Sequence, residues 1–218
     1  MNKKKPDEKI KKFVEALART APTQDFVNQY AYGKRENKIR RDNLIKYLTL
    51  YQNKRVDILC IGEAPGYKGS LKTGVPFSSE EILITNKFFT SSKAFKIENR
   101  ANPSWEMSAK IVWQAMDHLH FYPLIWSAFP FHPHEAKKTE SNRRPTSKEI
   151  EFGAKFLREL IKIFEIKHFV SVGRIAEKSL CDLGFKSIYI RHPSHGGAEL
   201  FFSGLKEIKS RRATTDFF

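Results

Sequence analysis

Residues 56–77 read VDILCIGEAPGYKGSLKTGVPF and combine an apolar run with a glycine-rich loop. An almost continuous apolar run ends at Gly62, which is the pattern of a strand buried in a parallel sheet. The loop after Gly62 contains three further glycines, two prolines, one carboxylate (Glu63) and the aromatic residues Tyr67 and Phe77. Ligands bind at the carboxyl ends of strands in open α/β sheets, so the loop is a candidate functional site. An ordinary strand-to-helix connection is the alternative.

Strands alternate with helices in the remainder of the chain. Apolar runs predict further strands at 121–129, 167–173 and 186–190, and amphipathic segments between them predict helices, including one capped by Thr146 or Ser147. This alternation predicts an α/β fold, a three-layer α/β/α sandwich around a central, mostly parallel four-stranded sheet. The polar segment 132–145 is expected to be a mobile surface loop.

The charge of the chain favours a polyanionic partner. The formal net charge is +15, and residues 1–55 alone carry 15 Lys and Arg against 6 Asp and Glu. Such a balance indicates nucleic acid binding, although a lysine-rich solvated surface would give the same count. We expect residues 1–55 to be a basic helical segment packed on the core.

The composition also limits the compartment and the cofactors. Cys60 and Cys181 form no CxxC pair and are expected to be reduced thiols. No membrane-spanning run or secretory signal is present in the sequence. We therefore expect a cytoplasmic monomer without cofactor or membrane partner, associated with the nucleoid if bacterial.

Three polar loops should meet at one edge of the sheet, because all parallel strands end there. They are GEAPGYKGSLKTGVPF (62–77), SAFPFHPHE (127–135) and RHPSHGG (191–197). His132, His134 and Glu135 would offer metal ligands, but proline separates the histidines and no further ligand is signalled. No metal is therefore expected.

These loops resemble those of the uracil-DNA glycosylase superfamily. Gly62-Glu63-Ala64-Pro65 resembles its first motif, and His192-Pro193-Ser194 resembles its second. GEAPG and NRRPTSKEI (142–150) are similar to the iron–sulfur group, and TGVPF is similar to the single-strand-selective monofunctional group. Two cysteines cannot build a four-cysteine cluster. The resemblance implies that residues 56–218 form a uracil-DNA-glycosylase-like domain.

The resemblance also implies site roles. His192 would stabilise the anionic leaving base and Glu63 would orient water or offset sugar charge. Residues expected to contact the base are Gly62, Ala64, Gly66, Tyr67, Phe77 and Ser127, with Phe77 stacking on it; those expected to contact DNA are Lys68, Arg191, Ser194, His195 and Gly196.

The implied activity is removal of a damaged base, uracil above all, from DNA. Two positions depart from the family pattern. Ala64 stands where other members carry a water-positioning Asn or Asp, and Ser127 stands where many carry an Asn that reads the uracil edge. A glycosylase-fold protein that binds nucleic acid without hydrolysis is therefore the alternative.

Overall fold

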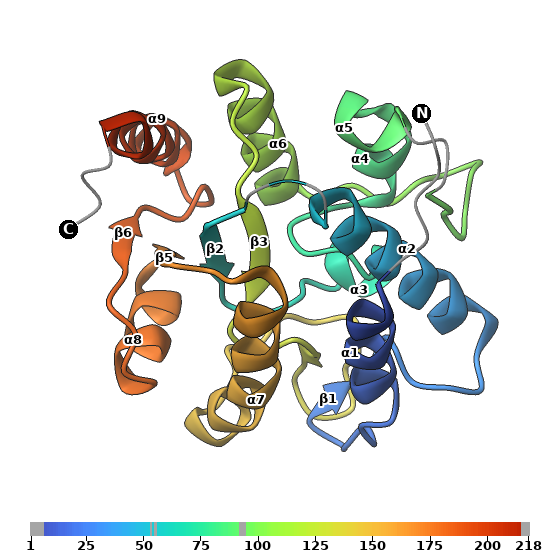
Figure 1. Ribbon diagram of the computed structural model, residues 1–218. Coiled ribbons are helices and arrows are strands. Elements are labelled where there is room, and N and C mark those ends of the chain that lie inside the picture. The colour runs from blue at the N-terminus through green and yellow to red at the C-terminus, as the bar shows by residue number, and fades with distance from the viewer. Residues whose placement is uncertain (1–6, 53, 55, 92–94, 215–218) are drawn as a thin grey trace.

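The computed structural model describes residues 7–52, 54, 56–91 and 95–214 (Figure 1). Within these ranges no helix is both long and apolar enough to cross a bilayer. The elements run in the order α1 (Glu8–Ala18), β1 (Phe26–Val27), α2 (Arg35–Tyr51), β2 (Ile58–Gly62), α3 (Ser70–Thr73), α4 (Glu80–Thr85), α5 (Lys87–Thr90), α6 (Met107–Leu119), β3 (Leu124–Ser127), β4 (His132–Pro133), α7 (Ser147–Phe164), β5 (His168–Val172), α8 (Arg174–Asp182), β6 (Ile188–Ile190) and α9 (Ala198–Thr214).

The main sheet has the strand order β3-β2-β5-β6, and every neighbouring pair is parallel. All five residues of β2 are buried, as its apolar run predicts. The helices α1, α7 and α8 gather in the lower part of Figure 1 and α6 and α9 in the upper part, on either side of the strands. The predicted α/β/α class and the four-stranded parallel sheet are confirmed.

Helix α2 covers the free edge of β3. The Tyr47 hydroxyl accepts from the amide of Ile125 at 2.9 Å, and the Tyr51 hydroxyl donates to the carbonyl of Pro123 at 3.2 Å. An edge strand otherwise exposes unpaired backbone groups, so these tyrosines close it. Helices α1 and α2 contribute buried side chains such as Ile10 and Leu44 to the same apolar cluster as the sheet.

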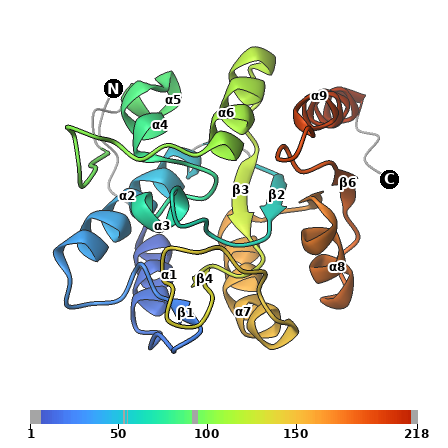
Figure 2. The same cartoon turned by 180° about the vertical axis from the view of Figure 1, so that it is seen from behind.

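The segment 132–145 differs from the expected mobile surface loop. Strand β4 pairs antiparallel with β1, and His132 is fully buried. The Arg143 guanidinium donates to both carboxylate oxygens of Glu149 and to the carbonyl of Asp25. These contacts anchor the segment at both ends. Figure 2 shows it from the side of β4.

Candidate active site

The end of β2 sets the first part of the site. Gly62 is the register partner of Ser127, the last residue of β3. The chain then turns, and the carbonyl of Glu63 accepts from the amide of Phe129 at 3.1 Å. Glu63 is thereby held, partly buried, at the carboxyl edge of the sheet. Burial raises the pKa of its carboxyl, and the positive charge of Arg144 opposes that rise.

Phe77 is held over the end of β2 by its backbone. It has a φ of 47°, and its carbonyl accepts from the indole Nε1 of Trp113 at 2.8 Å. The ring lies so close to Gly62 that any Cβ added there would overlap it. The glycine at this position is therefore required for the placement of the aromatic ring.

The last polar loop brings His192 to the same place. The ring centroids of Phe77 and His192 are 5.9 Å apart, with 40° between the ring planes. The first and last loops, which follow β2 and β6, therefore meet at one edge of the sheet as parallel topology requires. Phe77 thus lies against Gly62 on one side and beside His192 on the other.

Ser194 fixes the tautomer of His192. Its backbone amide donates to Nδ1 at 3.2 Å, and its hydroxyl lies 2.7 Å from the same atom. Because Nδ1 accepts the amide bond, the proton of the neutral ring sits on Nε2. Burial lowers the pKa of His192 to about 4, and the positive charges of Arg191 and His195 contribute to the shift. At neutral pH His192 is thus an uncharged donor.

Four of the residues predicted to contact DNA lie at the surface of the two loops. Lys68, Arg191, His195 and Gly196 are exposed. His195 and Gly196 have φ values of 51° and 72°, and these left-handed residues turn the chain into α9. The ring Nδ1 of His195 lies 3.0 Å from the Ser194 hydroxyl. Two exposed cations and one exposed histidine therefore lie in the loops that form the site.

Comparison with known proteins identifies the family. The sequence profile of the uracil DNA glycosylase superfamily matches residues 49–205. The chain belongs to this superfamily. Its structure is similar to the crystal structure of wild-type SMUG2 from Pedobacter heparinus, with a TM-score of 0.70 and 21% identity over 96% of this chain and 97% of that one. That likeness shows a shared fold. No curated protein sequence matches the chain significantly.

In this superfamily member the first motif loop is tied to the segment 132–146 by two hydrogen bonds. The amide of Tyr67 donates to Oδ1 of Asn142 at 3.0 Å, and Nδ1 of His132 lies 2.7 Å from the carbonyl of Pro65. The backbone amide of Tyr67 is thus already bonded within the protein, so a contact of Tyr67 with the base would have to come from its side chain. No hydrogen bond engages the amide of Gly66 within the described residues.

The histidines near the loop do not form a metal centre. His132 directs its two ring nitrogens at the carbonyls of Pro65 and Thr139, and burial lowers its pKa. His134 lies beside it, with 6.0 Å between the ring centroids. Nowhere in the described part of the chain do three His, Cys, Asp or Glu residues gather as a metal site. The ring nitrogens of His132 therefore anchor this segment to backbone carbonyls.

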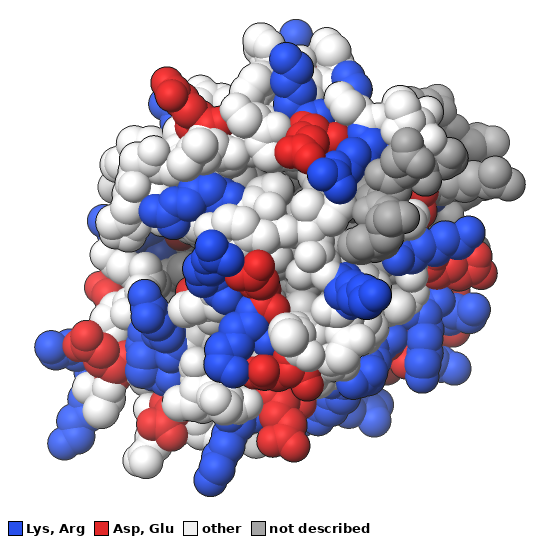
Figure 3. All heavy atoms as spheres, turned by 90° about the vertical axis from the view of Figure 1, so that its left-hand side faces the viewer, with Lys and Arg blue, Asp and Glu red and all other residues white. Residues whose placement is uncertain are grey.

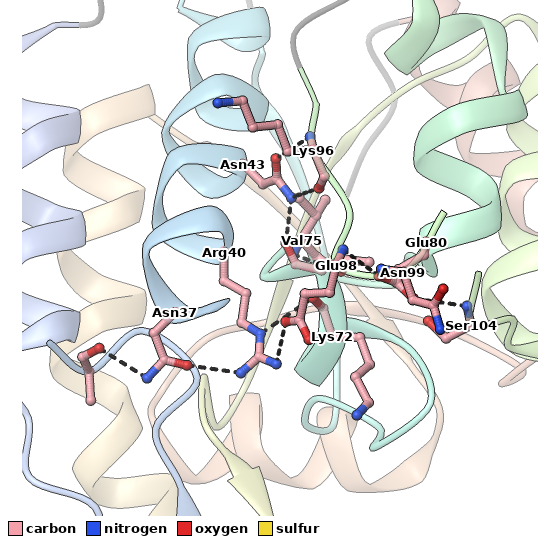
Figure 4. A network of polar contacts seen from close by, with 12 residues as sticks. Asn37, Arg40, Asn43, Lys72, Val75, Glu80, Lys96, Glu98, Asn99 and Ser104 are labelled. Carbon is pink, nitrogen blue, oxygen red and sulfur yellow. Dashed lines mark hydrogen bonds and ion pairs between the residues drawn. The ribbon is translucent and has the colours of Figure 1, made fainter. Parts of the chain in front are cut away.

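A buried polar network fixes the TGV turn of the superfamily loop (Figure 4). Arg40 of α2 donates to the carbonyl of Lys72 and pairs with Glu98 at 2.6 Å. Asn43 donates to the carbonyls of Thr73 and Lys96. Helix α2 thus clamps the loop before Phe77 against the segment that begins at residue 95.

The same network continues towards α6. The carboxylate of Glu80 accepts from the backbone amides of Glu98, Asn99 and Ser104 at 2.7 to 3.2 Å. Ser104 lies two residues before Glu106, whose carboxyl reaches the motif loop. Glu106, Arg144 and Trp113 were not predicted from the sequence. The NRRPT run was a signal for Arg144, whereas no local signal distinguished Glu106.

Proposed function

We propose that this chain is a monofunctional DNA glycosylase that hydrolyses the N-glycosidic bond of uracil in DNA, as a monomer acting in base excision repair. The observation that carries the proposal is the contact between Phe77 and a neutral His192 whose Nε2 keeps its proton. An aromatic face and a fixed donor are what an extruded base needs for stacking and for charge stabilisation. Membership of the superfamily supports the same reaction class.

The leaving base becomes an anion as its bond to the sugar breaks. A donor aimed at its O2 stabilises this charge where it develops, and loss of one such donor typically costs ~3–4 kcal/mol of barrier. Nε2 of His192 is suited to this role, because Ser194 engages the opposite ring nitrogen. A neutral donor also requires no proton uptake from solvent at pH 7.

Glu63 serves the other half of the reaction. A carboxylate at the edge of the sheet offsets the positive charge of an oxocarbenium-like sugar and orients the attacking water. Arg144 favours its ionised form against the effect of burial. Ala64 cannot share this task, since its side chain is a methyl group that packs on the core.

DNA binding would use the exposed edge of the site. Lys68, Arg191, His195, Gly196 and Ser194 are proposed to contact phosphates beside the extruded nucleotide. On the face formed by α8, α9 and β6, basic and acidic side chains alternate (Figure 3), and pairs such as Arg174–Glu177 and Lys178–Asp182 engage several of them. We therefore assign the phosphate contacts to the loops at the site.

One observation favours a second candidate function. Ala64 and Ser127 lack the groups that other members place there, which suits a protein that binds nucleic acid without cleaving the bond. The two functions differ in one measurement. Oligonucleotides carrying uracil, hypoxanthine, xanthine or a modified pyrimidine, each single- and double-stranded, are incubated with the protein, and the released base is quantified. Release of uracil supports the glycosylase. Binding without release of any base supports the alternative.

A further inference from the structure

Glu106 places a second carboxyl group at the motif loop. It directly precedes α6, and its side chain lies against the backbone of Gly66 and Gly69. A Cβ added to Gly69 would come within 2.7 Å of the Glu106 Cδ, and one added to Gly66 within 3.4 Å. Each would also overlap one of the carboxyl oxygens. The two glycines therefore make room for this carboxyl group.

This carboxyl group has no partner within the described residues, neither a hydrogen bond to its side chain nor an ion pair. Because neither oxygen is a fully sealed polar atom, the carboxyl group keeps some access to solvent. Glu80, in the neighbouring network, accepts three backbone amides instead. Desolvation of a polar group without a compensating bond is unfavourable, and a ligand that supplies the bond removes that cost.

When it is protonated, the Glu106 carboxyl group can both donate and accept a hydrogen bond. Burial raises its pKa to about 7. The elements around Glu106 carry several titratable groups: Tyr67, Lys68 and Lys72 of the loop, Glu80 and Glu81 of α4, and Lys110 of α6. Burial is the sole cause of the pKa shift. Near neutral pH a large fraction of Glu106 is a carboxylic acid, with one O–H donor beside one acceptor oxygen.

That pair of groups matches the edge of uracil. The base presents O4 as an acceptor beside N3–H as a donor, and a flipped base is read through its Watson–Crick edge. A side-chain amide offers the same donor and acceptor pair as a carboxylic acid. Ser127 offers only a hydroxyl, and it has no hydrogen-bond partner among the described residues. The superfamily site thus lacks an amide on β3 and has an unpartnered acid beside Gly66.

We propose that Glu106, as a carboxylic acid, is a base-reading residue that donates to O4 and accepts from N3–H of the extruded uracil. This rests on the proposed function, because it assumes that the base extruded towards Phe77 and His192 is uracil. Binding leaves the acid protonated and moves no proton. Glu106 therefore recognises the base and takes no part in the bond-breaking step.

The test compares Glu106→Gln with Glu106→Leu. Glutamine keeps the donor and acceptor without the titration, and leucine keeps the bulk without either. Glu81→Leu is the matched control, since it removes an acid from the neighbouring helix. Single-turnover release of uracil and NMR-detected binding of free uracil are both measured from pH 5.5 to 9, with circular dichroism as a check on folding.

We expect Glu106→Leu to lose about 10-fold or more in release and in uracil affinity, with Glu81→Leu unchanged. Wild-type affinity should fall as pH rises through about 7, and Glu106→Gln should hold its affinity across that range. Equal uracil binding by the wild type and Glu106→Leu would overturn the inference, as would a folded Glu106→Gln as weak as the leucine variant. The binding of free uracil tests the role of Glu106 even if the wild type releases no base. Absence of base release would count against the proposed function alone.

Discussion

Phe77 and His192 follow the first and last strands of the parallel sheet, and their ring centroids lie 5.9 Å apart. This contact depends on Gly62, because the Phe77 ring occupies the space of a Cβ at that residue. One glycine thus determines whether the stacking surface faces the proposed leaving-group donor. The relationship links a local sequence feature to the chemistry of the site.

The first prediction concerns that glycine. Gly62→Ala should displace the Phe77 ring and lower kcat/KM for uracil release by about 10-fold or more, since stacking a base on an aromatic ring is worth ~1–3 kcal/mol. Phe77→Leu should lose a similar amount. Phe152→Leu, at an exposed phenylalanine of α7, is the matched control and should be unaffected. Parent-like kcat/KM in Gly62→Ala would show that the ring position is unimportant.

The second prediction concerns the charge of His192. Its ring should titrate near pH 4 when followed by NMR, well below an ordinary histidine. Arg191→Gln should raise this pKa while leaving it below 6.5, because burial is the larger cause. As pH falls from about 6.5 towards 4, the unfolded chain takes up a proton at this residue and the folded chain does not, so stability falls. A midpoint near 6.5 in the wild type would refute the neutral-donor assignment.

The third prediction separates Glu63 from Ala64. Glu63→Gln should lower the single-turnover rate by at least ~10-fold, near the bottom of the range for general-base assistance. Ala64→Asn should raise the single-turnover rate very little, because Glu63 already orients the attacking water. Binding to the uracil-containing strand is measured alongside. The proposed role of Glu63 would be contradicted if the glutamine variant kept full activity while Ala64→Asn was much faster than the parent.

Local patterns were sufficient to predict the fold. The buried runs of β2 and β5 are continuous in the sequence, and α7 begins at the expected cap, where Thr146 and Glu149 form a reciprocal capping box. The pair β1–β4 was not predictable, since each strand has only two residues and neither gives a periodic signal. The segment 132–145 was interpreted as mobile because its polarity does not reveal distant partners such as Pro65.

The candidate site was predictable only for residues in the loops that directly follow the strands of the sheet. Gly62, Phe77 and His192 follow strands that end at the same sheet edge, so topology brings them together. Glu106 lies far from the motif loop in the chain, and its approach depends on how Glu80 holds the segment before α6. Tertiary contacts of this kind leave no mark in local sequence spacing.

The fourth prediction concerns salt. Affinity for undamaged DNA should fall steeply between low and moderate salt, since each neutralised phosphate releases a counterion. The slope should be smaller than the net charge suggests, because Arg40 and Arg41 are bonded to Glu98 and to backbone carbonyls. Removing residues 1–6, which include Lys3, Lys4 and Lys5, should weaken binding without changing base preference. A flat filter-binding titration would contradict nucleic acid binding.

His192 is proposed to stabilise negative charge that appears only as the base departs. The direct measurement is the single-turnover rate of uracil release by the wild type and by His192→Ala, with the affinity of each protein for the same oligonucleotide. We predict a rate loss on the order of 100-fold or more with little change in affinity, since the donor acts on the transition state. Equal losses in rate and affinity, or an unchanged rate, would contradict the account.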